Sequence, residues 1–221
     1  MKSTLRRYAR RAAFTLLASA VLVGGGTSLA ALTFDAAPAG AVTIPPWEPD
    51  PGAVGGLIFY NSSGTAITSG NLTDSPLAAY VQGTSTVRSG DTKATLYGYL
   101  PVASTQPSAW TDIQIGSSTT YPNATAPSPL TTSTLPVETG ASGDVSVAGL
   151  QSELPNNDTS SDGYAGMYQL RLYTNAAKKS QTTTYDEADI LISGSTWSVV
   201  YPSTPTLTTL AVAPSGGQSY G

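Results

Sequence analysis

The sequence of 221 residues contains no histidine and no cysteine. Without histidine there is no Ser-His-Asp or Cys-His relay and no imidazole metal site. Without cysteine there is no disulfide framework, no thiolate nucleophile and no zinc site built on thiolates. Charged residues are also scarce at 11%, whereas Ser and Thr together make up about a quarter of the chain. This composition is typical of a β-rich extracellular protein.

The first 41 residues are expected to form a signal peptide. Five basic residues precede an apolar run from Ala12 to Val23, which is shorter than the roughly 20 residues of a membrane span. Ala39-Gly40-Ala41 fits the A-x-A pattern of signal peptidase, so the mature chain is predicted to begin at Val42. A permanent anchor or a buried core helix is the alternative. Arg10-Arg11-Ala12-Ala13-Phe14 matches a twin-arginine signal poorly, which favours general secretion and an extracellular or cell wall location.

Removal of this leader makes the mature chain distinctly acidic. The formal charge of the whole chain is −4, but half of its ten basic residues lie in the leader. Five basic residues then face thirteen carboxylates, which gives a net charge of −8. With no basic cluster beyond Lys178-Lys179, binding to nucleic acid or to anionic lipid is not expected. Because cysteine is absent, the fold must depend on a hydrophobic core.

The mature chain is expected to contain three parts. Residues 42–54 hold four prolines and are predicted to be a linker. Residues 55–202 show short apolar or alternating runs between turn residues, which predicts one antiparallel β-sandwich of the immunoglobulin-like, Greek-key type. The predicted strands are Leu57–Tyr60, Thr65–Thr68, Leu77–Gln82, Thr92–Leu100, Asp112–Ile115, Met167–Thr174, Ala188–Ser193 and Thr196–Tyr201.

One short helix is predicted over Ser146–Leu154. Val147, Leu150 and Leu154 recur there at helical spacing, and Pro155 ends the pattern. We expect this helix to cover one end of the sandwich. Elsewhere the pattern predicts strands, and Ser193-Gly194-Ser195 indicates a hairpin between the last two of them.

Residues 203–221 are expected to contain a linker and one further strand. A lone strand cannot bury its apolar face, so the segment is either a tail or the start of another domain. Leu210-Ala211-Val212-Ala213-Pro214 resembles the L-x-V-x-P opening strand of bacterial immunoglobulin-like repeats in actinobacterial surface proteins. Residues 55–202 are similar to the N-terminal β domain of such proteins, in the segments Gly56–Asn61, Arg88–Tyr97, Thr120–Asn123 and Thr196–Val199.

The resemblance implies a secreted or cell-surface module with a structural or adhesive role and no enzymatic activity. Its ligand would be an unidentified protein or polysaccharide, the module would be a monomer, and no cofactor is expected. The alternative is a carbohydrate-binding module. Tyr97 and Tyr99 lie on one face of a predicted strand and, with Trp110 or Tyr121, can form a platform on which sugars stack. The core of a domain that has few other aromatics must take up about half of such rings, so a place in the core is the favoured interpretation.

A third hypothesis is an accessory domain of a carboxylate-dependent glycoside hydrolase, with Glu138, Glu153 and Glu187 as candidates. The densest acidic cluster is Asp186-Glu187-Ala188-Asp189, where Asp186 and Asp189 are expected to project into solvent and to guard a strand against edge pairing. Lys178-Lys179 lies in a polar turn and is expected to be solvated, which speaks against Ser-Lys chemistry.

Calcium is the one metal for which the sequence offers candidate ligands. The loop Asn156–Gly163 is rich in oxygen ligands, with Asp158 and Asp162 as candidates. It lacks the EF-hand spacing and the closing glutamate, and these residue types are also what a long loop uses. No metal site is therefore predicted.

Overall fold

The computed structural model describes residues 44–156 and 163–202. The chain divides into two compact units, residues 1–39 and 40–221. The predicted signal peptide, residues 1–41, and the predicted strand after residue 202 lie outside the described residues. The description that follows concerns the second unit alone.

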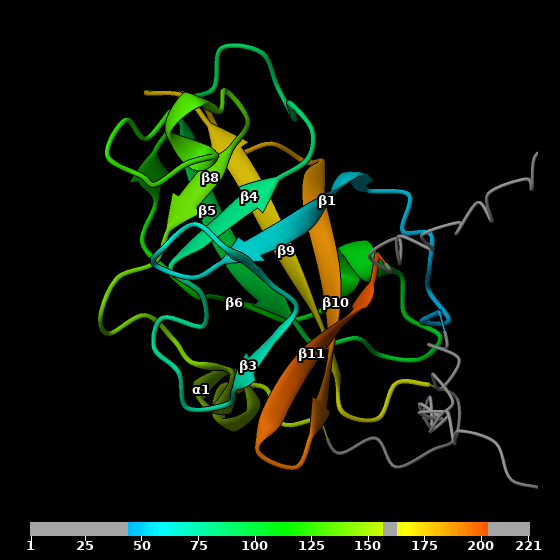
Figure 1. The fold of residues 1–221 in the computed structure, drawn as a ribbon. Coiled ribbons are helices and arrows are strands. Elements are labelled where there is room, and N and C mark those ends of the chain that lie inside the picture. The colour runs from blue at the N-terminus through cyan, green and yellow to red at the C-terminus, as the bar shows by residue number, and fades with distance from the viewer. Residues whose placement is uncertain (1–43, 157–162, 203–221) are drawn as a thin grey trace, which may run out of the picture. The chain divides into compact units, whose positions relative to one another are not determined.

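The described part of the chain is mostly β with one short α-helix, which confirms that part of the predicted fold class (Figure 1). All eight predicted strands are present, although their ends move by a few residues. The structure adds three strands of two or three residues each, β3, β7 and β8. The strands are β1 Ala53–Tyr60, β2 Ala66–Ile67, β3 Ser69–Asn71, β4 Tyr80–Gly83, β5 Lys93–Tyr99, β6 Asp112–Gln114, β7 Thr119–Thr120, β8 Val137–Thr139, β9 Met167–Asn175, β10 Tyr185–Ser193 and β11 Thr196–Tyr201.

These strands form one hydrogen-bonded sheet of 11 strands among the described residues, in the order β6-β5-β9-β10-β1-β4-β8. The short strands β2, β3 and β7 and the strand β11 pair beside this path. One side chain links the short strand β7 to β8, since the Thr119 hydroxyl accepts a hydrogen bond from the Thr139 amide at 3.0 Å. The structure thus contains one mixed, open sheet rather than two separate sheets.

Strand β1 explains this departure from the expected antiparallel sandwich. Its first half pairs with β10 in parallel, with Gly56 opposite Glu187. Its second half pairs with β4 antiparallel, from Leu57 opposite Gly83 onward. One continuous strand therefore belongs to both parts of the sheet and joins them. The expectation that all strands pair antiparallel was wrong for β1 and β10, because their pairing joins segments about 130 residues apart and leaves no local pattern.

The main hydrophobic core lies between these two parts of the sheet. It takes Phe59 from β1 and Val81 from β4, and it takes Leu170 and Ile190 from β9 and β10. In Figure 1, β1 and β4 run across β9. Trp197 of β11 is fully buried against Phe59, with ring centroids 5.4 Å apart.

The single α-helix, α1 (Val147–Glu153), confirms the predicted helix. The Ser146 side chain accepts a hydrogen bond from the Gly149 amide at 3.1 Å and so caps the N-terminus. Leu150 is fully buried and packs over Gly98 of β5, where a Cβ would lie 2.8 and 2.9 Å from its two methyl groups. Among the described residues, none of the helices is long and apolar enough to cross a membrane.

Strand β9 is buried on both faces, which positions the sites described below. Tyr168, Leu170 and Leu172 enter the main core, as their alternation predicts. On the opposite face Gln169, Arg171 and Tyr173 are also buried, although a sheet with one solvated face would expose them. This second face is covered by residues 44–52, part of the predicted linker, and by the 3-10 helix η1 (Pro107–Ala109).

Candidate functional site

Arg171 is the centre of the second buried face. Its side chain is 1% exposed, and its guanidinium stacks over the rings of Tyr99 at 3.9 Å and Tyr185 at 4.3 Å. A buried cation requires a counter-charge. Asp50, from the segment before β1, supplies it through an ion pair of 3.2 Å with Nη2 of Arg171.

The polar groups around this ion pair have partners within the protein. Arg171 also donates to the side chain of Gln169 and to the Pro107 carbonyl. The Tyr185 hydroxyl donates at 2.7 Å to Oδ2 of Asp50, the same oxygen that accepts from Arg171. Burial raises the pKa of Tyr185, so that its hydroxyl stays protonated and acts as a donor. The Arg171 charge is therefore neutralised internally.

An open hollow of about 440 Å³ lies beside Arg171, within the size range of small-molecule sites. We call it the aromatic hollow. Aromatic side chains from β5, β9 and β10 line it together with polar side chains of the turn before β10. Its lining residues are Tyr97, Tyr99, Ser108, Trp110, Asp112, Arg171, Tyr173, Gln181, Thr182, Thr183 and Tyr185.

The structure brings the three predicted sugar-binding aromatics together in this hollow. Tyr97 is half-buried, and its ring meets Tyr173 edge to face at 5.7 Å. Tyr99 and Trp110 also line the hollow, but they are 9% and 4% exposed and belong to a second buried cluster. Only Tyr97 of the three therefore offers much ring surface to a ligand. Tyr121, the alternative to Trp110, lies in the main core.

Several residues of the hollow are not among the residues that the sequence predicted to bind sugar. Arg171 and Tyr173 alternate with apolar residues along β9, a pattern that predicts a solvated face. Tyr185 precedes the predicted start of its strand. The one signal in the sequence is an arginine in the middle of an otherwise uncharged strand, between Gln169 and Tyr173.

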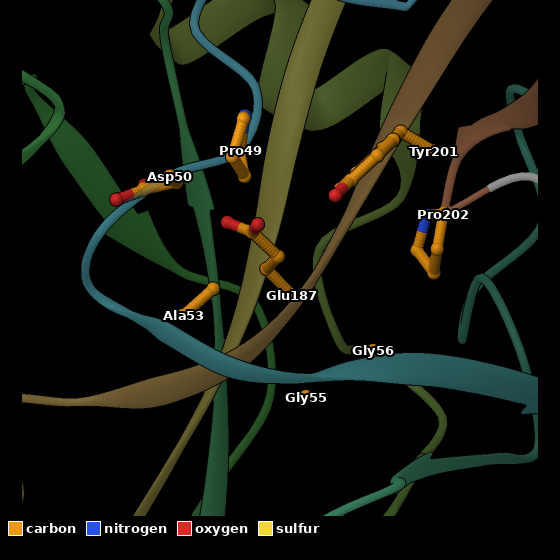
Figure 2. A pocket seen from close by; sticks show the side chains of 8 residues that line it. All are labelled: Pro49, Asp50, Ala53, Gly55, Gly56, Glu187, Tyr201 and Pro202. Atoms are coloured by element: carbon orange, nitrogen blue, oxygen red, sulfur yellow. The ribbon is translucent and has the colours of Figure 1, made fainter.

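A second, smaller pocket of about 190 Å³ has Asp50 among its lining residues (Figure 2). We call it the carboxyl pocket. In Figure 2 the hydroxyl of Tyr201 points toward the carboxyl of Glu187. Its lining residues are Pro49, Asp50, Ala53, Gly55, Gly56, Glu187, Tyr201 and Pro202.

The acidic residues of β10, of which Glu187 lines this pocket, are buried, contrary to the sequence-based expectation. Asp186 and Asp189 were predicted to project into solvent, but both are fully buried, and Glu187 is 2% exposed. Asp186 lies under the backbone of Gly83 and accepts hydrogen bonds from the side chain and backbone of Ser85. Because both faces of β10 are covered, alternation along this strand does not separate buried from exposed positions.

Three carboxyls meet beside the pocket. Glu48 is in hydrogen-bond contact with both Glu187 and Asp189, and the Trp47 indole donates to Asp189 at 3.2 Å. Burial, followed by repulsion from Glu48, raises the pKa of Glu187 to about 10 and that of Asp189 well above its usual range. The cluster therefore holds protons at neutral pH.

The other predicted candidates lie elsewhere. Glu138 on β8 is 2% exposed and Glu153 on α1 is exposed, and neither lines the two pockets. Lys178 and Lys179 are exposed in the turn between β9 and β10. The calcium candidates Asp158 and Asp162 fall outside the described residues.

In the part of the chain that the structure describes, no three acidic side chains are arranged to hold a metal ion.

Comparison with protein-family models, with curated proteins and with solved structures finds no match to this chain.

Proposed function

We propose that the chain is a secreted or cell-surface, non-enzymatic β module that adheres to carbohydrate through the aromatic hollow. The observation that carries this proposal is the convergence of Tyr97, Tyr99 and Trp110 on one open hollow. Aromatic rings give a flat apolar surface for the CH groups of a sugar ring. Among the described residues, the glutamates considered for hydrolysis, Glu138, Glu153 and Glu187, do not come together at one pocket, and only Glu187 lines one of the two pockets.

The polar side chains of the hollow suit a neutral sugar. Gln181, Thr182 and Thr183 supply hydroxyl and amide groups that both donate and accept, which is what sugar hydroxyls require. Asp112 is exposed at the same hollow and disfavours an anionic ligand. The Arg171 charge is already matched by Asp50, so it does not select for acidic sugars.

The test is a pull-down on insoluble polysaccharides, followed by titration with soluble oligosaccharides. Tyr97→Ala should weaken binding at least tenfold, because it removes the most exposed ring of the hollow. Tyr80→Ala is the matched control, since Tyr80 is also half-buried on a strand but does not line the hollow. The proposal fails if the unaltered protein binds no polysaccharide with millimolar affinity or better, or if both variants bind alike.

A purely structural role in a tandem array is the second candidate. It is supported by the resemblance to immunoglobulin-like repeat proteins and by a core shared between β1 with β4 and β9 with β10. In this proposal these two parts of the sheet act as the layers of an immunoglobulin-like, Greek-key sandwich. Sequencing past Gly221 tests it, because a stop codon without further repeats would remove the tandem array.

A further inference from the structure

We propose that the carboxyl pocket binds a small primary alkylammonium ion, with Glu187 as the anionic contact. The pocket has one polar end and apolar walls. Glu187 and Tyr201 form the polar end, while Pro49, Ala53 and Pro202 supply hydrocarbon surface. A volume of about 190 Å³ accommodates several heavy atoms, since a water molecule takes roughly 30 Å³ in the liquid.

The main observation is that one oxygen of the Glu187 carboxyl, Oε2, lacks a hydrogen-bond donor. Its side chain is 2% exposed, and within residues 44–156 and 163–202 its Oε2 has no hydrogen-bond partner. The carboxyls beside it, Glu48, Asp50 and Asp189, are acceptors when ionised. A buried acceptor without a donor costs free energy, and a ligand that brings donors removes this cost.

The nearest cations and donors of the protein are already engaged. Arg171 pairs with Asp50 and donates to two further oxygens, and the Tyr201 hydroxyl is in contact with Glu48. Among the described residues, the surroundings of the pocket thus contain four carboxyls, Glu48, Asp50, Glu187 and Asp189, but only one guanidinium. A ligand carrying positive charge and several N–H groups complements this excess.

An alkylammonium fits these features better than a metal ion. In the described part of the chain no acidic triad has the arrangement that a metal requires. An ammonium group carries three donors, which can be shared between Glu187 and the Tyr201 oxygen, and its alkyl chain can lie against the prolines. A proton, by contrast, bridges two oxygens and leaves the pocket empty.

Binding should be linked to proton release. The titratable groups facing Glu187 are Glu48 and Asp50 from the preceding segment, Asp189 from its own strand and Tyr201 from β11. Burial and these neighbours raise the pKa of Glu187, so the free pocket carries protons at neutral pH. An ammonium ion displaces them, and affinity therefore rises with pH until the amine itself loses its proton near pH 10.

The experiment is calorimetric titration of the full chain with n-butylammonium chloride at pH 8. We expect saturable binding that 1-butanol, the uncharged counterpart, does not reproduce. Glu187→Gln should weaken it at least tenfold, while Glu153→Gln, which alters an exposed glutamate of α1, should leave it unchanged. Binding that persists undiminished in Glu187→Gln would overturn the proposal.

Two further outcomes decide the matter if the Glu187 variant does not fold. In the unaltered protein, titrations in two buffers of different ionisation enthalpy should show proton release, and its absence contradicts the proposed site. Calcium chloride is titrated separately. Calcium binding without butylammonium binding would identify a metal site instead, and neither binding would show that the carboxyls hold protons only.

Discussion

Glu138 provides the sharpest test of the electrostatics of this fold. It lies on β8 (Val137–Thr139), is 2% exposed, and its Oε1 has no hydrogen-bond partner among the described residues. Burial, followed by repulsion from Asp144, raises its pKa from 4.5 to about 8. The folded protein therefore binds a proton that the unfolded chain releases above pH 4.5.

The sign of the effect follows from this difference. Stability that is present below pH 4.5 is lost as the pH rises, and the loss is complete above about pH 8. One pKa unit corresponds to about 1.4 kcal/mol, so this carboxyl accounts for a loss of about 5 kcal/mol across the window. About 3 kcal/mol of it is lost by pH 7.

Glu138→Gln replaces the carboxyl, which is repelled by Asp144, with a neutral amide of similar shape. We expect the variant to gain stability relative to the unaltered protein as the pH rises from 4.5 to 8. Urea unfolding followed by tryptophan fluorescence measures both proteins at each pH. Other buried acids, such as Asp186 and Glu187, cancel in the difference.

The control is Glu153→Gln, which alters a glutamate that is exposed on α1. Its stability should differ from that of the unaltered protein by a constant amount at every pH. If the Glu138→Gln difference is also constant between pH 4.5 and 8, Glu138 ionises normally in the folded state and the reasoning from burial is refuted.

Two further predictions concern packing and local structure. Arg171→Met leaves Asp50 as an uncompensated buried charge and should lower the unfolding free energy by about 3 to 5 kcal/mol in urea titrations, with partial recovery in the double variant with Asp50→Asn. A double variant no more stable than Arg171→Met would contradict the ion-pair explanation. Ser146→Ala removes the helix cap and should cost about 1 kcal/mol in thermal unfolding, whereas Ser152→Ala on the exposed face of α1 should cost less.

The strands could be predicted wherever one chain segment carries its own pattern. Tyr168, Leu170 and Leu172 alternate, and β9 forms where they predict it. The helix was equally local, since Ser146 and Pro155 mark its ends. Strands β3, β7 and β8 are too short to show a period. They pair because neighbouring strands present free edges, which is a property of the assembled sheet.

The site was predictable only in part, for a related reason. Tyr97 and Tyr99 share a face of one strand, so their convergence follows from alternation. The burial of Arg171 and Asp189 does not, because their cover comes from segments distant in sequence, at residues 47–50 and 107–110. Alternation identifies two faces of a strand, but it cannot show that both are covered.

Asp50 connects the two pockets and shows why the segment before β1 matters. It lines the carboxyl pocket, and its carboxylate accepts from Arg171 and Tyr185, which line the aromatic hollow. A chain that began at Gly55 would lose this carboxylate and leave the guanidinium buried without a counter-charge, a loss of several kcal/mol. Trp47 and Glu48, which contact the carboxyls of β10, would be lost with it. The proline-rich segment therefore holds both pockets in shape, and binding measurements on either pocket require it.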